Sequence, residues 1–142
     1  MTRVLAVDPG TKRVGLALSD PSRTIAQPLA SLPAEPSETL PGRVAALAAE
    51  NDVGDIVVGL PRRLDGSNGP EALAARELAG ALRQASGLRV TLVDERLTSV
   101  AAERALLAAG ESRRRRRELS DRVAAALILQ QHLDREARRG GR

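Results

Sequence analysis

The chain has 142 residues, a formal net charge of +4 at pH 7 and no cysteine. This length predicts one domain with a sizeable core, and the lack of cysteine excludes a disulfide framework and thiolate metal sites. No stretch approaches about 18 consecutive apolar residues and no charged-then-apolar leader opens the chain, so we expect a soluble, untargeted, cytoplasmic protein. Aromatic residues are absent, which excludes the base stacking that single-strand binders commonly use.

The positive charge is concentrated near the C-terminus. Residues 112–142 contain 10 arginines and 4 acidic residues, whereas residues 1–111 carry a small excess of acids. A basic segment of this kind predicts an anionic partner such as nucleic acid. Arginine outnumbers lysine 21 to 1 over the whole chain, a ratio that we attribute to compositional bias.

Three strands are predicted first in chain order. The apolar runs 3–8 and 14–19 are joined by a turn short enough for an antiparallel hairpin, and 24–32 forms a third strand. Pro28 lies in this third strand and cannot donate a ladder hydrogen bond. We therefore expect the third strand at an edge of the sheet.

Helices and strands then alternate. The apolar spacing predicts a helix over 38–50, and the apolar runs 55–61 and 89–95 are typical of strands buried on both faces. Between these strands a helix begins at Pro70 and ends at Gly87. The apolar face of this helix is expected to consist of Ala74, Leu78, Ala81, Leu82 and Ala85.

Two helices are predicted to close the chain. One runs from Thr98 or Ser99 to about residue 109, and one from 121 to about 135 with Ser120 as its cap. The charged stretch between them is interpreted as a link, and 139–142 as a frayed basic tail after a single domain over 1–138. The order β-β-β-α-β-α-β-α-α predicts an α/β fold. Its mixed five-stranded sheet has a three-strand antiparallel part plus parallel strands, with helices on both faces.

Carboxylates occur where the predicted strands end. Asp8 ends the first strand, and Asp94 and Glu95 end the last. If these strands run parallel, the three acids share one edge of the sheet, where ligands of open α/β sheets bind. Gly59 ends the intervening strand and would let a ligand approach the backbone, and Asp121 begins the final helix.

Each acid also has a purely structural explanation. Asp8 could cap the turn, Asp94 and Glu95 could form a solvated strand end beside Arg96, and Asp121 could favour the helix dipole. Together, however, several carboxylates without histidine or cysteine indicate Mg²⁺ or Mn²⁺, because clustered acids without a cation would repel one another. Metal ions held in this way support phosphoryl displacement, and the basic segment fits a phosphodiester substrate.

Other basic residues are open to a structural or a functional interpretation. Lys12 and Arg13 either contact phosphate or stabilise the hairpin turn. His132, the only histidine, is expected at the surface, roughly 16 Å along the final helix from Asp121 and too far to share its ion. A run of arginines either forms a solvated loop or contacts the substrate. It consists of Arg113, Arg114, Arg115, Arg116 and Arg117.

Four stretches resemble the sequence blocks of the YqgF/RuvX family. They read "VDPGTKRVGLALSD", "VVGLPRRLDGS", "VDERLTSVAAERAL" and "SDRVAAALILQQHL", and together they cover nearly the whole chain. The resemblance implies an RNase H-like fold and a metal-dependent nuclease. Members of the family are linked to maturation of the 5′ end of 16S ribosomal RNA and are also described as Holliday junction resolvases.

The resemblance further implies a catalytic, metal-binding set of Asp8, Glu95 and Asp121, with Asp94 in a weaker role. Many nucleases of the wider RNase H group have an acid at the end of the fourth strand, where this chain reads Gly59-Leu60-Pro61. The acid is therefore expected from the fifth strand. The implied partner is a pre-rRNA or branched DNA, and symmetrical cutting of a four-way junction would favour a homodimer.

Two other classes of function stay open at this point. The phosphate loop of actin-like proteins and sugar kinases also resembles D-x-G-x-K, but those proteins duplicate the domain, and 142 residues leave no room for a second copy. The other class is a non-catalytic RNA-binding module of ribosome assembly with the same fold. The retained acids argue against that module.

Overall fold

A mixed five-stranded sheet forms the centre of the computed structural model, which describes residues 2–10, 12–61, 69–95 and 113–140, with the backbone alone over 113–121. The strands are β1 (Arg3–Pro9), β2 (Arg13–Ser19), β3 (Ala26–Pro33), β4 (Val53–Leu60) and β5 (Arg89–Asp94). Their order is β3-β2-β1-β4-β5. The first three strands pair antiparallel, and β4 pairs parallel with both β1 and β5.

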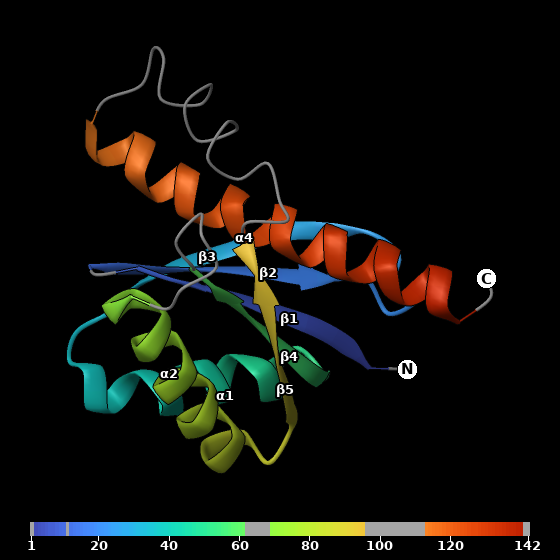
Figure 1. Cartoon of the computed structure of the whole chain (residues 1–142), viewed down its shortest axis with the longest axis horizontal. Helices are drawn as coiled ribbons and strands as arrows, with labels where there is room; N and C mark the ends of the chain where they lie inside the picture. Colours follow the sequence, from blue (N-terminus) through green and yellow to red (C-terminus); the bar gives the residue numbers. More distant parts are fainter. Residues whose placement is uncertain (1, 11, 62–68, 96–112, 141–142) are drawn as a thin grey trace.

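Helices cover both faces of this sheet. They are α1 (Leu40–Glu50), preceded by the short 3₁₀ turn η1 (Ser37–Thr39), then α2 (Pro70–Ser86) and α4 (Arg113–Arg139). Helices α1 and α2 lie on one face and α4 crosses the other (Figure 1). The predicted fold class is therefore confirmed. No described helix combines the length and apolarity needed to cross a membrane.

The alternation of side chains along the strands divides the core into two layers. Leu5 and Val7 of β1 belong to the layer beneath α1 and α2, whereas Val4 and Ala6 belong to the layer beneath α4. Ile128 of α4 is fully buried in that second layer. Each large apolar side chain buried in this way stabilises the fold by about 1.5–3 kcal/mol.

The proline-containing strand lies at the sheet edge, as predicted. Among the described strands, β3 pairs only with β2. The register shifts where Leu16 and Ala17 face Ala30 and Pro28, which leaves Leu29 as an extra residue. A proline lacks the N–H of a ladder bond, so a bulge at an edge strand accommodates it.

Helix α2 begins and ends as predicted, and its buried face overlaps the predicted one only in part. Pro70 opens it, and Gly87 ends it in the left-handed conformation at φ 70°, which glycine adopts without strain. The buried residues are Ala72, Ala75, Ala79 and Leu82, while Ala74 and Ala85 are exposed. The prediction is confirmed for Leu82 and for Leu78, which packs against the core. It was wrong for Ala74 and Ala85, because alanines occur all round this helix and apolar spacing alone did not single out one side.

Helix α4 is much longer than predicted. It starts at Arg113 and continues to Arg139, so the charged stretch before Ser120 is helical and not a link. The arginine run contains no glycine or proline, and arginine is a good helix former, so nothing local stops the helix. The helix predicted between 98 and 109 lies outside the described residues.

Candidate active site

Asp8 is a buried carboxylate near the end of β1. Its exposed fraction is 3%, and it lies opposite Gly15 of β2. By alternation it shares a face with Val4 and Ala6, which is the face covered by α4. The turn that follows needs glycine at position 10, because a Cβ there would lie 2.5 Å from the backbone oxygen of Arg13.

The carboxyl ends of three neighbouring parallel strands meet at this edge of the sheet. In register, Val7 of β1 faces Val58 of β4, and Leu60 of β4 faces Asp94 of β5. Asp8 therefore lies beside Gly59, with β4 separating it from the end of β5. The parallel arrangement brings the acids of the first and fifth strands to one edge, as expected.

Glu95 folds back over β4 toward α4. A Cβ added to Gly59 would lie 3.3 Å from both Cγ and Cδ of Glu95, and 3.0 Å from Cδ1 of Ile128. The missing side chain of Gly59 thus makes the space in which the Glu95 carboxyl group lies. Glu95 is partly buried there.

The alternation of side chains along β5 directs the adjacent residues Asp94 and Glu95 to opposite faces of the sheet. Asp94 is the last residue of β5 and has the same parity as Val90 and Leu92, which face α1 and α2. Glu95 lies against Gly59 and Ile128, on the side of Asp8. Asp8 and Glu95 therefore share a face of the sheet, whereas Asp94 projects to the other.

The donors at this edge fit a hard cation. Both are carboxylates, and oxygen ligands are what Mg²⁺ and Mn²⁺ prefer. Within the described residues no group of three or more histidines, cysteines or acids could hold a metal ion, so the pair needs a further ligand.

The predicted third ligand is Asp121, whose side chain lies outside the described residues. The helical backbone of α4 does include this position, one turn before Ala125 and two turns before Ile128. Both of these residues are buried against the sheet. The side chains of the arginine run, residues 113–117, also lie outside the description.

Two basic residues of the β1–β2 hairpin have different surroundings. Arg13 donates from Nε to Oγ of Ser31 at 2.9 Å and from Nη2 to the backbone oxygen of Ser31 at 3.2 Å. Its guanidinium therefore links β2 to β3, which favours a structural role for Arg13 over a phosphate contact. Lys12 is exposed beside the turn.

Arg122 is a candidate that the sequence reasoning missed. Its Nε is buried and has no hydrogen-bond partner in the described part of the chain. The residue lies one turn before Ala125 and two turns before Leu129, both buried against the sheet. A buried donor without an acceptor is costly, so an anion at this position would be stabilising. The only signal in the sequence is that Arg122 directly follows Asp121.

His132 is partly buried, contrary to the surface position expected for it. Burial lowers its pKa below the usual 6.5, and the charges of Glu136, Arg135, Asp55 and Arg23 act on it more weakly. Arg23 and Asp55 form an ion pair at the edge of the sheet opposite Asp8, with Nη1 of Arg23 2.7 Å from a carboxylate oxygen of Asp55. His132 thus contributes to packing at the far end of α4.

Comparisons with known proteins identify the family of this chain. The family model of RuvX, described as "Holliday junction resolvase", matches residues 2–135. A protein of Pelotomaculum thermopropionicum is 46% identical over 137 residues, which cover 96% of this chain and 89% of the relative. A protein of Moorella thermoacetica is 46% identical over 138 residues, covering 97% and 99%. Both relatives carry the name "Putative pre-16S rRNA nuclease".

Solved structures support the fold. RuvC of T. thermophilus in complex with a Holliday junction substrate superposes with a TM-score of 0.59 at 18% identity, over 99% of this chain and 97% of that one. The Fowlpox virus resolvase in complex with Holliday junction DNA gives a TM-score of 0.52 at 10% identity, over 93% and 99%. At these identities the likeness concerns the fold alone. The family match and the identity to relatives along nearly the whole chain show that this chain belongs to the RuvX family.

Proposed function

We propose that this protein is a metal-dependent nuclease that hydrolyses phosphodiester bonds in the 5′-end maturation of pre-16S ribosomal RNA. The observation that carries the proposal is the arrangement of Asp8 and Glu95, which come from two different strands to one edge and one face of the sheet. The names of the relatives supply the substrate. A role in ribosomal RNA maturation also implies a cytoplasmic protein.

In this proposal Asp8, Glu95 and Asp121 hold Mg²⁺ or Mn²⁺. The ion supplies a Lewis acid for a phosphoryl oxygen and lowers the pKa of a bound water. Asp8 contributes a fixed ligand because it is buried in the strand, and Gly59 provides the space that holds Glu95 in place. Asp94 acts less directly, since it projects to the other face.

The chain's own cations would hold the substrate. Arg122 offers a buried Nε without an acceptor among the described residues, which suits a phosphate oxygen. Lys12 is exposed on the turn that follows Asp8. The arginines 113–117 begin the same helix as Arg122 and add sequence-independent attraction for the backbone.

The first test replaces each acid with its amide. Asp8→Asn, Glu95→Gln and Asp121→Asn are each expected to lose cleavage by at least about 10²-fold, the order seen when one electrostatic catalytic group is removed. Asp94→Asn is the matched control and should lose much less. Cleavage of a pre-16S RNA fragment is measured with Mn²⁺, and calorimetric Mn²⁺ titration should show weaker binding by Asp8→Asn. Normal cleavage by all three amide variants would refute the nuclease proposal.

The second candidate substrate is branched DNA, because the family model is described by Holliday junctions. One preparation is therefore assayed side by side on the pre-16S fragment and on a synthetic four-way junction. Faster cleavage of the RNA is expected. Preferential, symmetrical cutting of the junction would instead assign the protein as a junction resolvase, which requires two copies of the chain.

A further inference from the structure

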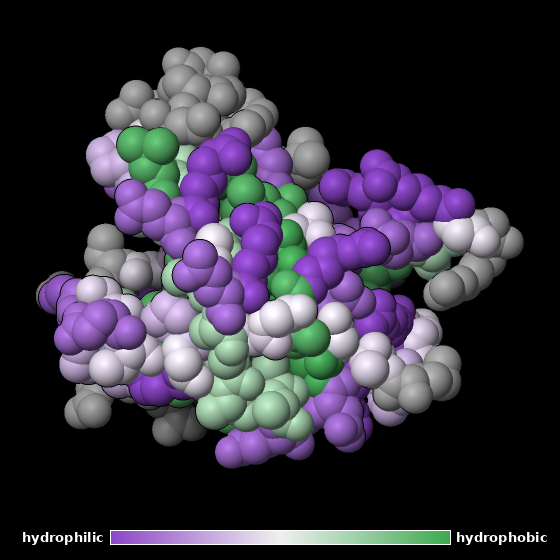
Figure 2. Space-filling model, turned by 90° about the horizontal axis from the view of Figure 1, so that it is seen from below, coloured by the Kyte–Doolittle hydropathy of each residue, from purple (hydrophilic) through white to green (hydrophobic). Residues whose placement is uncertain are grey.

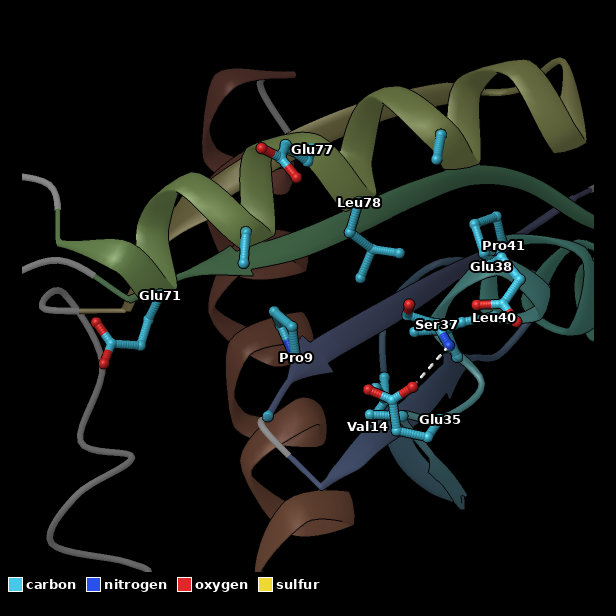
Figure 3. Close-up of a pocket in the computed structure, with 14 residues that line it drawn as sticks. Pro9, Val14, Glu35, Ser37, Glu38, Leu40, Pro41, Glu71, Glu77 and Leu78 are labelled. Atoms are coloured by element: carbon cyan, nitrogen blue, oxygen red, sulfur yellow. Dashed lines mark hydrogen bonds between the residues drawn. The ribbon is translucent and has the colours of Figure 1, made fainter.

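A groove of about 540 Å³ lies on the face of the sheet opposite α4. It is bounded by the β1–β2 turn, the segment between β3 and α1, and helix α2. Among the described residues, four glutamates line it and no lysine or arginine does so. They are Glu35, Glu38, Glu71 and Glu77 (Figure 3). This surface is called the Glu-rimmed groove below.

The floor of the Glu-rimmed groove is apolar. Val14 and Leu40 are buried beneath it, and Leu78 is directed from α2 into the space above Pro9 (Figure 3). Figure 2, which views the molecule from the side of α1 and α2, shows hydrophobic residues gathered between hydrophilic ones. An apolar floor of this size offers room for a few side chains, since small-ligand sites measure roughly 300–1,000 Å³.

The negative charge of the rim is not neutralised within the described chain. All four glutamates are exposed, and none of them forms an ion pair with a described residue. Glu35 accepts a hydrogen bond of 3.0 Å from the backbone N–H of Ser37. Clefts lined by charges of one sign over an apolar wall focus the electrostatic potential, so the groove attracts cations.

This chemistry excludes several occupants. A nucleic acid backbone would be repelled by the four carboxylates, and a bare metal ion would gain nothing from the apolar floor. The C-terminal residues 134–142 of a second copy are basic but contain no large apolar side chain. A suitable occupant needs positive charge and apolar side chains on one segment.

We propose that the Glu-rimmed groove docks a basic amphipathic segment of a partner protein. Its leucine-like side chains contact the accessible apolar residues Pro9, Ala74 and Leu78 above the buried floor, and its lysines or arginines reach the glutamates at the rim. This is the helix-in-groove mode of recognition, in which apolar anchors recur at i, i+3, i+4 and i+7. The nucleic acid and the partner protein then use opposite faces of the sheet.

The docked segment contacts the turn that carries the candidate site. Pro9 and Gly10 line the groove and directly follow Asp8 in the chain. The proposal does not depend on nuclease activity, however, because none of the groove residues belongs to the metal-binding set. It can therefore be tested by binding alone.

The test uses the ¹⁵N-labelled full chain and three synthetic 15-residue peptides. The first combines leucine and lysine at helical spacing, the second is a scramble of the same composition, and the third replaces every lysine with glutamate. We expect only the first to shift the amide signals of Gly10, Val14, Leu40 and Leu78 in a saturable manner. Equal shifts with the scramble would overturn the proposal, and so would equal shifts of the same amides by a short RNA strand.

Paired variants test the role of the rim. Glu71→Gln with Glu77→Gln should weaken binding of the first peptide about five- to tenfold, because each exposed pair is worth about 0.2–1 kcal/mol. Glu50→Gln with Glu136→Gln removes two exposed acids away from the groove and should leave affinity unchanged. Both pairs replace exposed helical residues with a good helix former, so the fold is retained. An equal loss of affinity in the two pairs would show that only net charge matters and would refute docking at the groove.

Discussion

Gly59 sets the position of a carboxylate by having no side chain of its own. The space where a Cβ would stand is bordered by Glu95 at 3.3 Å and by Ile128 at 3.0 Å. Contacts of that length are tighter than carbon atoms normally tolerate, so any side chain at position 59 displaces one neighbour or both. A displaced Glu95 would no longer face the site of Asp8 correctly.

Gly59→Ala is therefore expected to lower cleavage by less than the roughly 10²-fold that a misplacement of about 1 Å produces, because the neighbouring side chain has to move by only a few tenths of an ångström. Shortening the acid should relieve the collision, so Gly59→Ala combined with Glu95→Asp should recover part of the lost cleavage and Mn²⁺ affinity. Gly80→Ala is the matched control, because nothing lies within 4 Å of a Cβ there. Recovery with Ile128→Val but not with Glu95→Asp would contradict the positioning role.

His132 makes the stability of the fold depend on pH. Its pKa in the folded protein is lowered mainly by burial. At a pH between that folded pKa and the unfolded value of 6.5, the unfolded chain therefore binds more protons than the folded chain does. Stability is therefore expected to fall as pH decreases from 7 through 6.5 toward the folded pKa. In His132→Gln, the urea concentration at the midpoint of unfolding should change less with pH across this window. An unchanged pH dependence would show that other groups carry it.

Asp20 provides a control in a separate pH window. Hydrogen bonds from the backbone of Ile25, from Ser22 and from the backbone of Thr24 lower the pKa of its carboxyl group below 3.8. Its stabilising effect is complete above 3.8 and is lost as pH falls through the folded pKa. Asp20→Asn should consequently leave the change near pH 6.5 intact.

Helix α4 is the element that joins the candidate site to the basic segment. It packs on β1, β2 and β3, and its buried face contains Ala124, Ala125, Ile128 and Leu129. The same helix begins with the arginine run. Five consecutive helical positions, at 3.6 residues per turn, span the whole circumference of a helix, so only about two or three of these arginines can face one substrate strand at a time.

This geometry predicts the salt dependence of substrate binding. Replacing residues 113–117 with glutamine, which preserves helix propensity, should reduce the slope of log K against log salt by about 1.4–2.1 for a single strand. Fluorescence anisotropy with a labelled RNA fragment at several salt concentrations measures it. Metal binding should be unchanged. A reduction near 3.5 would mean that all five arginines contact the substrate, and an unchanged slope would mean that none does.

Over the whole molecule, the two faces of the sheet have different chemistry. The face beneath α4 carries Asp8 and Glu95, and the opposite face carries the Glu-rimmed groove. A ligand that binds the folded state and not the unfolded chain stabilises the folded state. Metal binding at the proposed site should therefore stabilise the whole domain.

Thermal unfolding tests this coupling. Wild type should be stabilised by about 2.7 kcal/mol when free Mn²⁺ reaches 100 times its dissociation constant. Asp8→Asn should unfold at the same or a higher temperature than wild type in metal-free buffer, and Mn²⁺ should raise its Tm much less. A lower Tm of the variant without metal would mean that Asp8 stabilises the fold by itself.

The sequence alone determined the elements and much of the topology, because these depend on local chemistry. Apolar runs marked all five strands, Pro28 placed β3 at an edge, and Pro70 and Gly87 bounded α2. The resemblance to the family blocks predicted Asp8, Glu95 and Asp121 as the metal-binding acids. Residues that fix backbone geometry or follow a strict period carry their signal in the sequence itself.

Only the tertiary structure decided which sides of these elements face one another. The full length of α4, the buried side of α2 and the burial of His132 result from packing against the sheet. The same holds for the two adjacent acids, since Glu95 lies on the side of Asp8 because it fits over Gly59. Such contacts join residues far apart in the chain, and local propensity does not encode them.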